Sequence, residues 1–238
     1  MKIITVVGAR PNFIKVAPFI HQIKIHNKLV SLNNNGKEIT HFLVHTGQHY
    51  DKRMSHKFFN ELDIPHADIN MGVGSGSHAE QVGNTMIAFE KVLIDLKPDW
   101  VVVVGDVNAT LASAITAKKL NVKVCHIEAG LRSFDIEMPE EINRIVTDRL
   151  ADLLLTPDKL SVKNLINEGV KKSNIEFVGN IMIDTLTKNL DLITSIDNFS
   201  PQEFSIERKY FVLTLHRPIN LKDKNLEIIF SGISEFTN

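Results

Sequence analysis

The sequence predicts an α/β fold built on a doubly wound parallel sheet, and three features of its 238 residues indicate it. Short runs rich in β-branched residues alternate with longer segments of helical character, as strands joined by crossover helices do. Several runs, such as WVVVVGD (100–106) and DLLLTPD (152–158), are apolar on both faces, as strands covered by helices on two sides must be. Charged residues gather where these runs end rather than within them.

Each expected strand is a short apolar run that ends at glycine or a polar residue. The strands span residues 3–8, 41–47, 100–106, 122–130, 152–158, 175–180 and 210–217. The expected helices span residues 11–27, 52–61, 77–97, 108–120, 139–150, 158–168, 181–194 and 223–236. Pro11 suits the first turn of the first helix, where no backbone donor is needed. Ser77 and Glu80 have the capping-box spacing ahead of the longest helix, and Pro98 with Asp99 ends it.

The last part of the chain does not complete a second sheet. Residues 180–238 contain a single good strand, YFVLTLHR, with a helix on either side. One strand cannot form a sheet or bury both of its faces. We therefore expect a complete first domain at residues 1–179, followed at 180–238 by a linker and the incomplete start of a second domain.

The composition argues against several classes of protein. Lys and Arg number 27 against 28 Asp and Glu, so a net charge of −1 offers no basic surface for nucleic acid. No apolar run approaches the roughly 20 residues that cross a bilayer, and the first residues lack the features of a signal peptide. The single cysteine, Cys125, lies in an apolar strand pattern without a disulfide partner, which fits a reducing compartment. We expect a cytoplasmic protein with no membrane or nucleic-acid partner.

Two cations follow the first expected strand. In an open α/β sheet, ligands bind in the crevice outside the carboxyl ends of the strands. Arg10 and Lys15 lie at the start of the first helix, where free N–H groups and the helix dipole already favour an anion such as a phosphate or diphosphate. The alternative is two solvated cations on a helix start. The segment has neither the G-x-G-x-x-G fingerprint nor a P-loop, which argues against nicotinamide cofactors and ATP.

Two carboxylates lie at the ends of neighbouring expected strands, and a similar run of apolar residues precedes each one. Asp106 follows WVVVVG, and Glu128 follows VKVCHI. Carboxylates that leave a buried strand tend to be partly desolvated, which moves their pKa toward the range useful for proton transfer. Asp106 has a structural alternative as the N-cap of the next helix. Glu128 has no common capping role.

Further candidates are weaker when taken alone. Glu140 and Glu141 open a helix after Pro139, where acids are an ordinary complement to the helix dipole, and Glu140 with Arg144 has the spacing of an ordinary surface pair. His216 lies at the end of the last apolar run; a lone histidine is more often structural, and its place at a strand end makes it a candidate. No zinc-ligand spacing and no G-x-S-x-G nucleophile elbow is present.

Seven ordered motifs resemble one family of enzymes. They are GARPNFIKVAP, HTGQHYD, VVVVGDVNATLA, HIEAGLRS, MPEEINR, VGNIMID and TLHRPIN. Together they look like the non-hydrolysing UDP-N-acetylglucosamine 2-epimerases. The resemblance implies a glycosyltransferase-B type of fold, in which the ligand lies between two Rossmann-like domains. It also implies interconversion of UDP-N-acetylglucosamine and UDP-N-acetylmannosamine, in which UDP leaves by elimination as the C2 proton is removed and adds back after a proton returns on the other face.

The resemblance implies roles for particular residues. Asp106, Glu128 and Glu140 match acid/base candidates of the family, and His216 matches the histidine of its H-R-x-x-N motif. Three further positions match residues that bind or act on the nucleotide sugar: Arg10, Lys15 and Arg144. The match reverses the structural preference for Glu140 and Arg144. It implies a UDP-sugar substrate, a homodimer for the full-length protein, and no metal or redox cofactor.

Two departures and several alternatives accompany the resemblance. Family members with an allosteric substrate site have an arginine after the T-G-Q-H or T-A-Q-H motif, whereas Tyr50 and Asp51 stand here, so regulation by a second substrate molecule is not expected. The family's second domain supplies much of the nucleotide binding, so we expect the 238-residue chain alone to have little or no activity. The alternatives are an epimerase of a modified UDP-sugar, a hydrolysing epimerase, a glycosyltransferase of the same fold, and an inactive half.

Overall fold

The computed structural model describes residues 1–47, 66–195, 213–215 and 218–237. They form two compact units, Met1–Ile193 and Thr194–Asn238. The second unit contains, among its described residues, the short helix η3 (Pro218–Leu221) and helix α8 (Asp223–Thr237). The domain boundary near residue 179 stays a prediction. None of the described helices is both long and apolar enough to span a membrane.

The first unit is built on a seven-stranded sheet in which every neighbouring pair is parallel. The strand order is β3-β2-β1-β4-β5-β6-β7. In chain order, the strands are β1 (Lys2–Val7), β2 (Thr40–His45), β3 (Ile69–Asn70), β4 (Trp100–Val104), β5 (Lys123–Ile127), β6 (Leu153–Thr156) and β7 (Ile175–Phe177). The order runs outward in opposite directions from β1 and β4, so the switch point of this doubly wound sheet lies between these two strands. Parallel sheets of this kind bind ligands at such a point.

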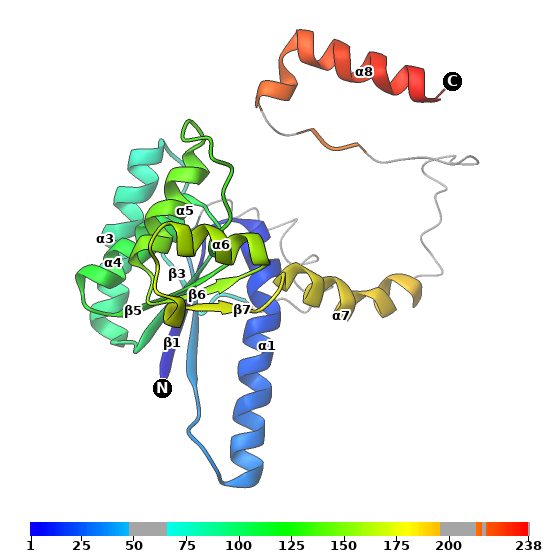
Figure 1. The fold of residues 1–238 in the computed structure, drawn as a ribbon. Coiled ribbons are helices and arrows are strands. Elements are labelled where there is room, and N and C mark those ends of the chain that lie inside the picture. The colour runs from blue at the N-terminus through cyan, green and yellow to red at the C-terminus, as the bar shows by residue number, and fades with distance from the viewer. Residues whose placement is uncertain (48–65, 196–212, 216–217, 238) are drawn as a thin grey trace. The chain divides into compact units, whose positions relative to one another are not determined.

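Helices cover both faces of the sheet (Figure 1). The helices of the first unit are α1 (Arg10–Asn33), α3 (His78–Leu96), α4 (Asn108–Lys119), α5 (Pro139–Leu150), α6 (Lys159–Asn167), η1 (Lys172–Asn174) and α7 (Ile181–Ser195). One core lies between the sheet and helices α3, α4 and α6, and the other lies between the sheet and α1, with the start of α7 packed against it.

Alternation along the strands explains the two cores. Val101 and Val103 of β4 face the first core, while Val102 and Val104 face the second, and all four are buried. Successive side chains of a strand point to opposite faces, so a strand covered on both sides must be apolar throughout. The uninterrupted valine run therefore predicted a central strand, and the structure confirms it.

Most of the predicted elements are confirmed, with shifted ends. The longest helix is α1, which continues to Asn33, six residues beyond the predicted end at residue 27. The predicted capping box forms, because the Ser77 backbone N–H donates to Glu80 Oε2 at 2.8 Å and the Glu80 N–H donates to Ser77 Oγ at 3.3 Å. The two-residue strand β3 was not predicted, since it is too short to show a period. The predicted helix at 52–61 and most of the strand at 210–217 lie outside the described residues.

Strands β4 and β5 end earlier than predicted because the backbone turns left-handed immediately after them. Gly105 has φ +67°, Glu128 has φ +69° and Gly130 has φ +82°. A Cβ at Gly130 would lie 2.5 Å from the Ser161 carbonyl oxygen of α6, so this turn packs directly against helix backbone. The two turns that carry Asp106 and Glu128 therefore depend on glycines.

Substitution Gly130→Ala should lower the free energy of unfolding by about 3 kcal/mol, because it adds a backbone clash to a left-handed φ. The matched control is Gly169→Ala, where φ is +84° and a Cβ would meet nothing within 4 Å. This control should lose only about 1 kcal/mol, from the strained φ alone. Urea unfolding followed by circular dichroism measures both. Equal losses in the two variants would contradict the packing described for the turn.

Candidate active site

The candidate site lies at the carboxyl ends of β1, β4 and β5. The Gly105 N–H donates to the Ile127 carbonyl oxygen at 3.1 Å, which holds the turn after β4 against the end of β5. A Cβ at Gly105 would lie 3.5 Å from both Lys15 Nζ and Glu128 Oε2. Glu128 and Lys15 therefore lie directly over Gly105, the residue before Asp106. The sequence-predicted candidates Asp106, Glu128 and Lys15 are brought together.

Lys15 and Glu128 form an ion pair across the ends of α1 and β5. Their Nζ and Oε2 atoms are 2.5 Å apart, and their side chains are 20% and 11% exposed. The pair joins a predicted phosphate-binding cation to a predicted acid/base group. Arg10 is the first residue of α1, and its side chain is outside the described part of the structure.

Asn12 links the loop before α1 to the end of β4. Its Oδ1 accepts the backbone N–H groups of Ala9 at 3.0 Å and Gly8 at 3.4 Å, while its Nδ2 donates to the Val104 carbonyl oxygen at 3.3 Å. The Asn12 side chain is buried. The first turn of α1 is therefore fixed relative to the strand that ends at Asp106.

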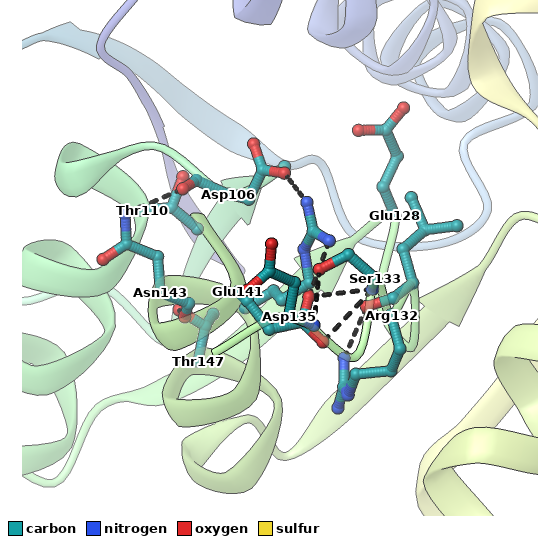
Figure 2. A network of polar contacts seen from close by, with 12 residues as sticks. Asp106, Thr110, Glu128, Arg132, Ser133, Asp135, Glu141, Asn143 and Thr147 are labelled. Atoms are coloured by element: carbon teal, nitrogen blue, oxygen red, sulfur yellow. Dashed lines mark hydrogen bonds and ion pairs between the residues drawn. The ribbon is translucent and has the colours of Figure 1, made fainter. Parts of the chain in front are cut away.

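Asp106 is held by helix α5. Its carboxylate forms an ion pair with the Arg144 guanidinium, and its carbonyl oxygen accepts an N–H from Asn143 Nδ2 at 2.8 Å. The N-cap of α4 is Val107, without a side-chain cap, so the interpretation of Asp106 as an N-cap is wrong. Figure 2 shows Asp106, Asn143 and the neighbouring residues of this network. The Asp106 carboxylate remains about one-third exposed and faces solvent at the edge of the sheet.

Glu141 is a second partner of Arg144, and it is not among the candidate site residues predicted from the sequence. Arg144 donates from its second terminal nitrogen to Glu141 Oε2 at 2.8 Å, so it bridges Asp106 and Glu141. The proposed surface pair of Glu140 with Arg144 is replaced by this contact. Glu141 is 1% exposed, and it also accepts the backbone N–H groups of Ser133 and Phe134 at 2.9 to 3.2 Å.

These donors control the charge of Glu141. Burial opposes its ionisation, and the N–H groups of Ser133 and Phe134 together with the Arg144 charge outweigh burial, so the pKa of Glu141 lies below its ordinary value. The Glu141 carboxylate is thus a buried anion that holds both the loop after β5 and the arginine on Asp106. The signal that could have revealed it is the spacing of Glu141 and Arg144, which places both on one helix face.

A pocket of about 260 Å³ opens beside Asp106. Asp106 and Glu140 line it together with Ala9, which immediately precedes Arg10. The other lining residues are His78, Gln81, Val107, Asn108, Pro139 and Asn143. Glu128 and Lys15 are not part of this lining; they pair with each other next to Gly105. The structure thus groups Asp106 with Glu140, and Glu128 with Lys15, around one glycine.

Other predicted features lie elsewhere. His216, Tyr50 and Asp51 are outside the described residues. Burial raises the pKa of the Cys125 thiol to about 12, as expected for a cysteine inside a central strand. Within the described ranges, no cluster of three or more His, Cys, Asp or Glu residues has the arrangement of a metal site.

Comparison with known proteins decides the family. A family model described as UDP-N-acetylglucosamine 2-epimerase matches residues 31–238. The chain belongs to this family. A crystal structure of the Methanocaldococcus jannaschii UDP-GlcNAc 2-epimerase in complex with UDP-GlcNAc and UDP is similar, with 41% identity and a TM-score of 0.85, over 99% of this chain and 62% of that one. The predicted Rossmann-like α/β fold and the family resemblance are confirmed.

Two further epimerases are similar to the present chain. A structure from Neisseria meningitidis bound to UDP-GlcNAc has 31% identity and a TM-score of 0.86, over 99% of this chain and 63% of that one. A Pseudomonas aeruginosa UDP-2,3-diacetamido-2,3-dideoxy-D-glucuronate 2-epimerase is 40% identical over 94% of this chain and 59% of the relative. The chain therefore spans about three-fifths of the length of these relatives.

Substitution Glu141→Gln should lower the free energy of unfolding at neutral pH by about 3 kcal/mol, because it leaves Arg144 with less compensation. The folded-state pKa of Glu141 is below the ordinary value of 4.5, so its stabilising charge is present above pH 4.5 and is lost as the pH falls further. The difference between wild type and variant should therefore shrink below pH 4.5, as measured by urea unfolding at several pH values.

The matched control is Glu140→Gln, one residue earlier on the exposed face of α5. It should change stability by less than about 0.5 kcal/mol at every pH. A Glu141→Gln loss that stays constant down to the lowest pH would show that Glu141 is not held as an anion.

Proposed function

We propose that this chain supplies the proton-transfer domain of an enzyme that interconverts UDP-N-acetylglucosamine and UDP-N-acetylmannosamine. The observation that carries the proposal is the match, at 41% identity and a TM-score of 0.85, to an epimerase structure that contains UDP-GlcNAc and UDP. The chemistry at the switch point of this sheet supports it independently. Carboxylates for proton transfer and a cation for a leaving diphosphate lie around Gly105.

The reaction inverts C2 of the sugar through elimination and re-addition. A base removes the C2 proton, the electron pair of that bond forms a C1–C2 double bond, and the C1–O bond to UDP breaks. UDP then adds back to C1 as an acid returns a proton to the other face of C2. Removal and return on opposite faces need two acid/base positions. Asp106 with Glu140, and Glu128, are the carboxylates proposed for these two positions.

The departing diphosphate needs positive charge. Lys15 is one-fifth exposed and lies next to the N-terminal turn of α1, where the helix dipole also favours an anion. Its pairing with Glu128 means that the same cation is close to an acid/base group and to the leaving group. Arg144 has a different role, because it binds the Asp106 carboxylate and orients it. Arg10 as a diphosphate ligand and His216 as a further catalytic group complete the proposal.

The identity of the sugar has a second candidate. The Pseudomonas aeruginosa relative, which is named as a 2-epimerase of a diacetamido uronate sugar, is 40% identical to this chain. It favours a modified UDP-sugar as the alternative substrate, with the same chemistry at C2. The family resemblance also supports a homodimer in the cytoplasm, and it ranks a glycosyl transfer to an acceptor below epimerisation.

The test is exchange of the C2 hydrogen with solvent. The 238-residue chain, joined to the remaining C-terminal region of the Methanocaldococcus jannaschii relative, is incubated with UDP-N-acetylglucosamine in deuterated water. Proton magnetic resonance should show loss of the C2 signal and growth of UDP-N-acetylmannosamine, while the 238-residue chain alone should show little or none. Asp106→Asn should lower the rate at least about 100-fold, the size of a general acid–base contribution.

The control is Asp152→Asn, at the opposite edge of the sheet, which should leave the rate near that of wild type. A joined protein that is folded and binds UDP, yet exchanges no C2 hydrogen in either UDP-sugar, would contradict the proposal. Rapid exchange with only the modified sugar would select the alternative substrate.

A further inference from the structure

A second polar network lies next to the two turns of the candidate site and takes no part in the chemistry proposed above. His126, in β5, is fully buried. Its Nε2 lies 2.8 Å from the Gly105 carbonyl oxygen, and its Nδ1 lies 2.6 Å from Asp148 Oδ1. Asp148 comes from α5 and its side chain is 1% exposed. Both ring nitrogens therefore face oxygen atoms in a region without solvent.

The partners of the ring decide its protonation. A carbonyl oxygen can only accept a hydrogen bond, so Nε2 must carry a proton. An ionised carboxylate also only accepts, so Nδ1 must carry one as well when Asp148 is charged. A neutral imidazole has a single N–H and can satisfy only one of these two acceptors. The geometry requires a doubly protonated ring wherever Asp148 is an anion.

Asp148 has the partners of an anion. Its Oδ2 accepts the Gly130 N–H at 3.0 Å and an N–H of Arg132 at 2.7 Å. Burial opposes ionisation of this carboxyl, and the His126 ring and Arg132 outweigh it, so the pKa of Asp148 lies below its ordinary value. Arg132 in turn donates two hydrogen bonds to Glu168, each of 2.7 Å. His126, Asp148 and Arg132 thus form a buried row that ends at Glu168, whose side chain is 39% exposed, and the opposite charges of Asp148 and Arg132 make their burial tolerable.

This buried row contacts both turns of the site. The Gly105 carbonyl belongs to the peptide that leads into Asp106, and His126 binds it. The Gly130 N–H lies two residues after Glu128, and Asp148 binds it. Figure 2 shows Glu128 and Arg132 pointing in opposite directions from the segment after β5, so the acid/base group and the buried row lie on different sides of it.

We propose that His126 is a positioning residue held as an imidazolium by Asp148, and that its Nε2–H, with Asp148, fixes the two turns that present Asp106 and Glu128. The catalytic part of this inference rests on the proposed function. The protonation of His126 and the coupling of the two turns do not depend on the proposed function. A neutral ring, which has a single N–H, would leave either the Gly105 carbonyl or the Asp148 carboxylate without its hydrogen bond and so loosen one of the two turns, although His126 never touches the sugar.

The protonation is tested on the ¹⁵N-labelled 238-residue chain by long-range proton–nitrogen correlation of its histidine rings. His126→Gln identifies the signals by their loss. Both ring nitrogens of His126 should have the shifts of protonated nitrogen, because each faces an oxygen acceptor. A non-protonated shift at either nitrogen of the folded wild-type chain would overturn the proposal, and this measurement needs no variant to fold and no turnover.

The coupling is tested with Asp148→Asn. The asparagine no longer supplies the carboxylate that requires the second ring proton, so one ring nitrogen should have the shift of a non-protonated nitrogen. The amide signals of Gly130, which loses its carboxylate acceptor, and of Gly105 and Asp106, which the ring holds, should differ from those of the wild type. In the joined enzyme the variant should lower kcat at least tenfold with little change in KM.

Asp152→Asn is the matched control, because Asp152 also binds a cation, Lys118, and a backbone N–H, that of Val124, but at the other end of β5. It should leave the His126 ring and the Gly105 and Asp106 amides unchanged. Gly105 and Asp106 amide signals that are the same in folded Asp148→Asn as in the wild type would contradict the coupling. An imidazolium ring in a joined enzyme that exchanges no C2 hydrogen would refute the proposed function and leave the coupling standing.

Discussion

The ion pair between Arg144 and Asp106 is the contact on which the arrangement of the site depends. It fixes helix α5 against the end of β4, and it is supported from behind by Glu141, which is buried and ionised. Glu141 in turn holds the loop after β5 through two backbone N–H groups. One arginine thus connects the carboxylate that faces the pocket with the segment that continues from Glu128.

Helix α5 presents its charges in a regular way. Glu141, Arg144 and Asp148 lie three and four residues apart, which places them on one face of the helix, toward the strand ends. Buried charges are costly unless they are paired, and each of these has at least one partner of opposite sign. The helix therefore packs against the strand ends largely through ion pairs and hydrogen bonds to the backbone. Such contacts have strict geometry, which is what an acid/base site needs.

Sequence reasoning predicted the architecture and the edge of the sheet where the candidate site lies. Two-sided apolar strands and capping residues are local signals, and parallel strands bring their carboxyl ends together, so Asp106 and Glu128 were expected to be neighbours. Pairings between distant segments were not predictable. The contact of Lys15 with Glu128 joins residues 113 positions apart, and the burial of Glu141 depends on how α5 packs. Acids in a first helical turn usually face solvent, and this one faces the loop after β5.

Binding of the nucleotide sugar at the switch point is the central claim, and a titration of the ¹⁵N-labelled joined protein with UDP-N-acetylglucosamine tests it most directly. The account predicts saturable shifts of the backbone amides of Gly8, Gly105 and Asp106, at the ends of β1 and β4. It predicts no shifts at Val124 and Asp152, at the opposite edge of the sheet. Saturation with the first three amides unmoved would contradict it.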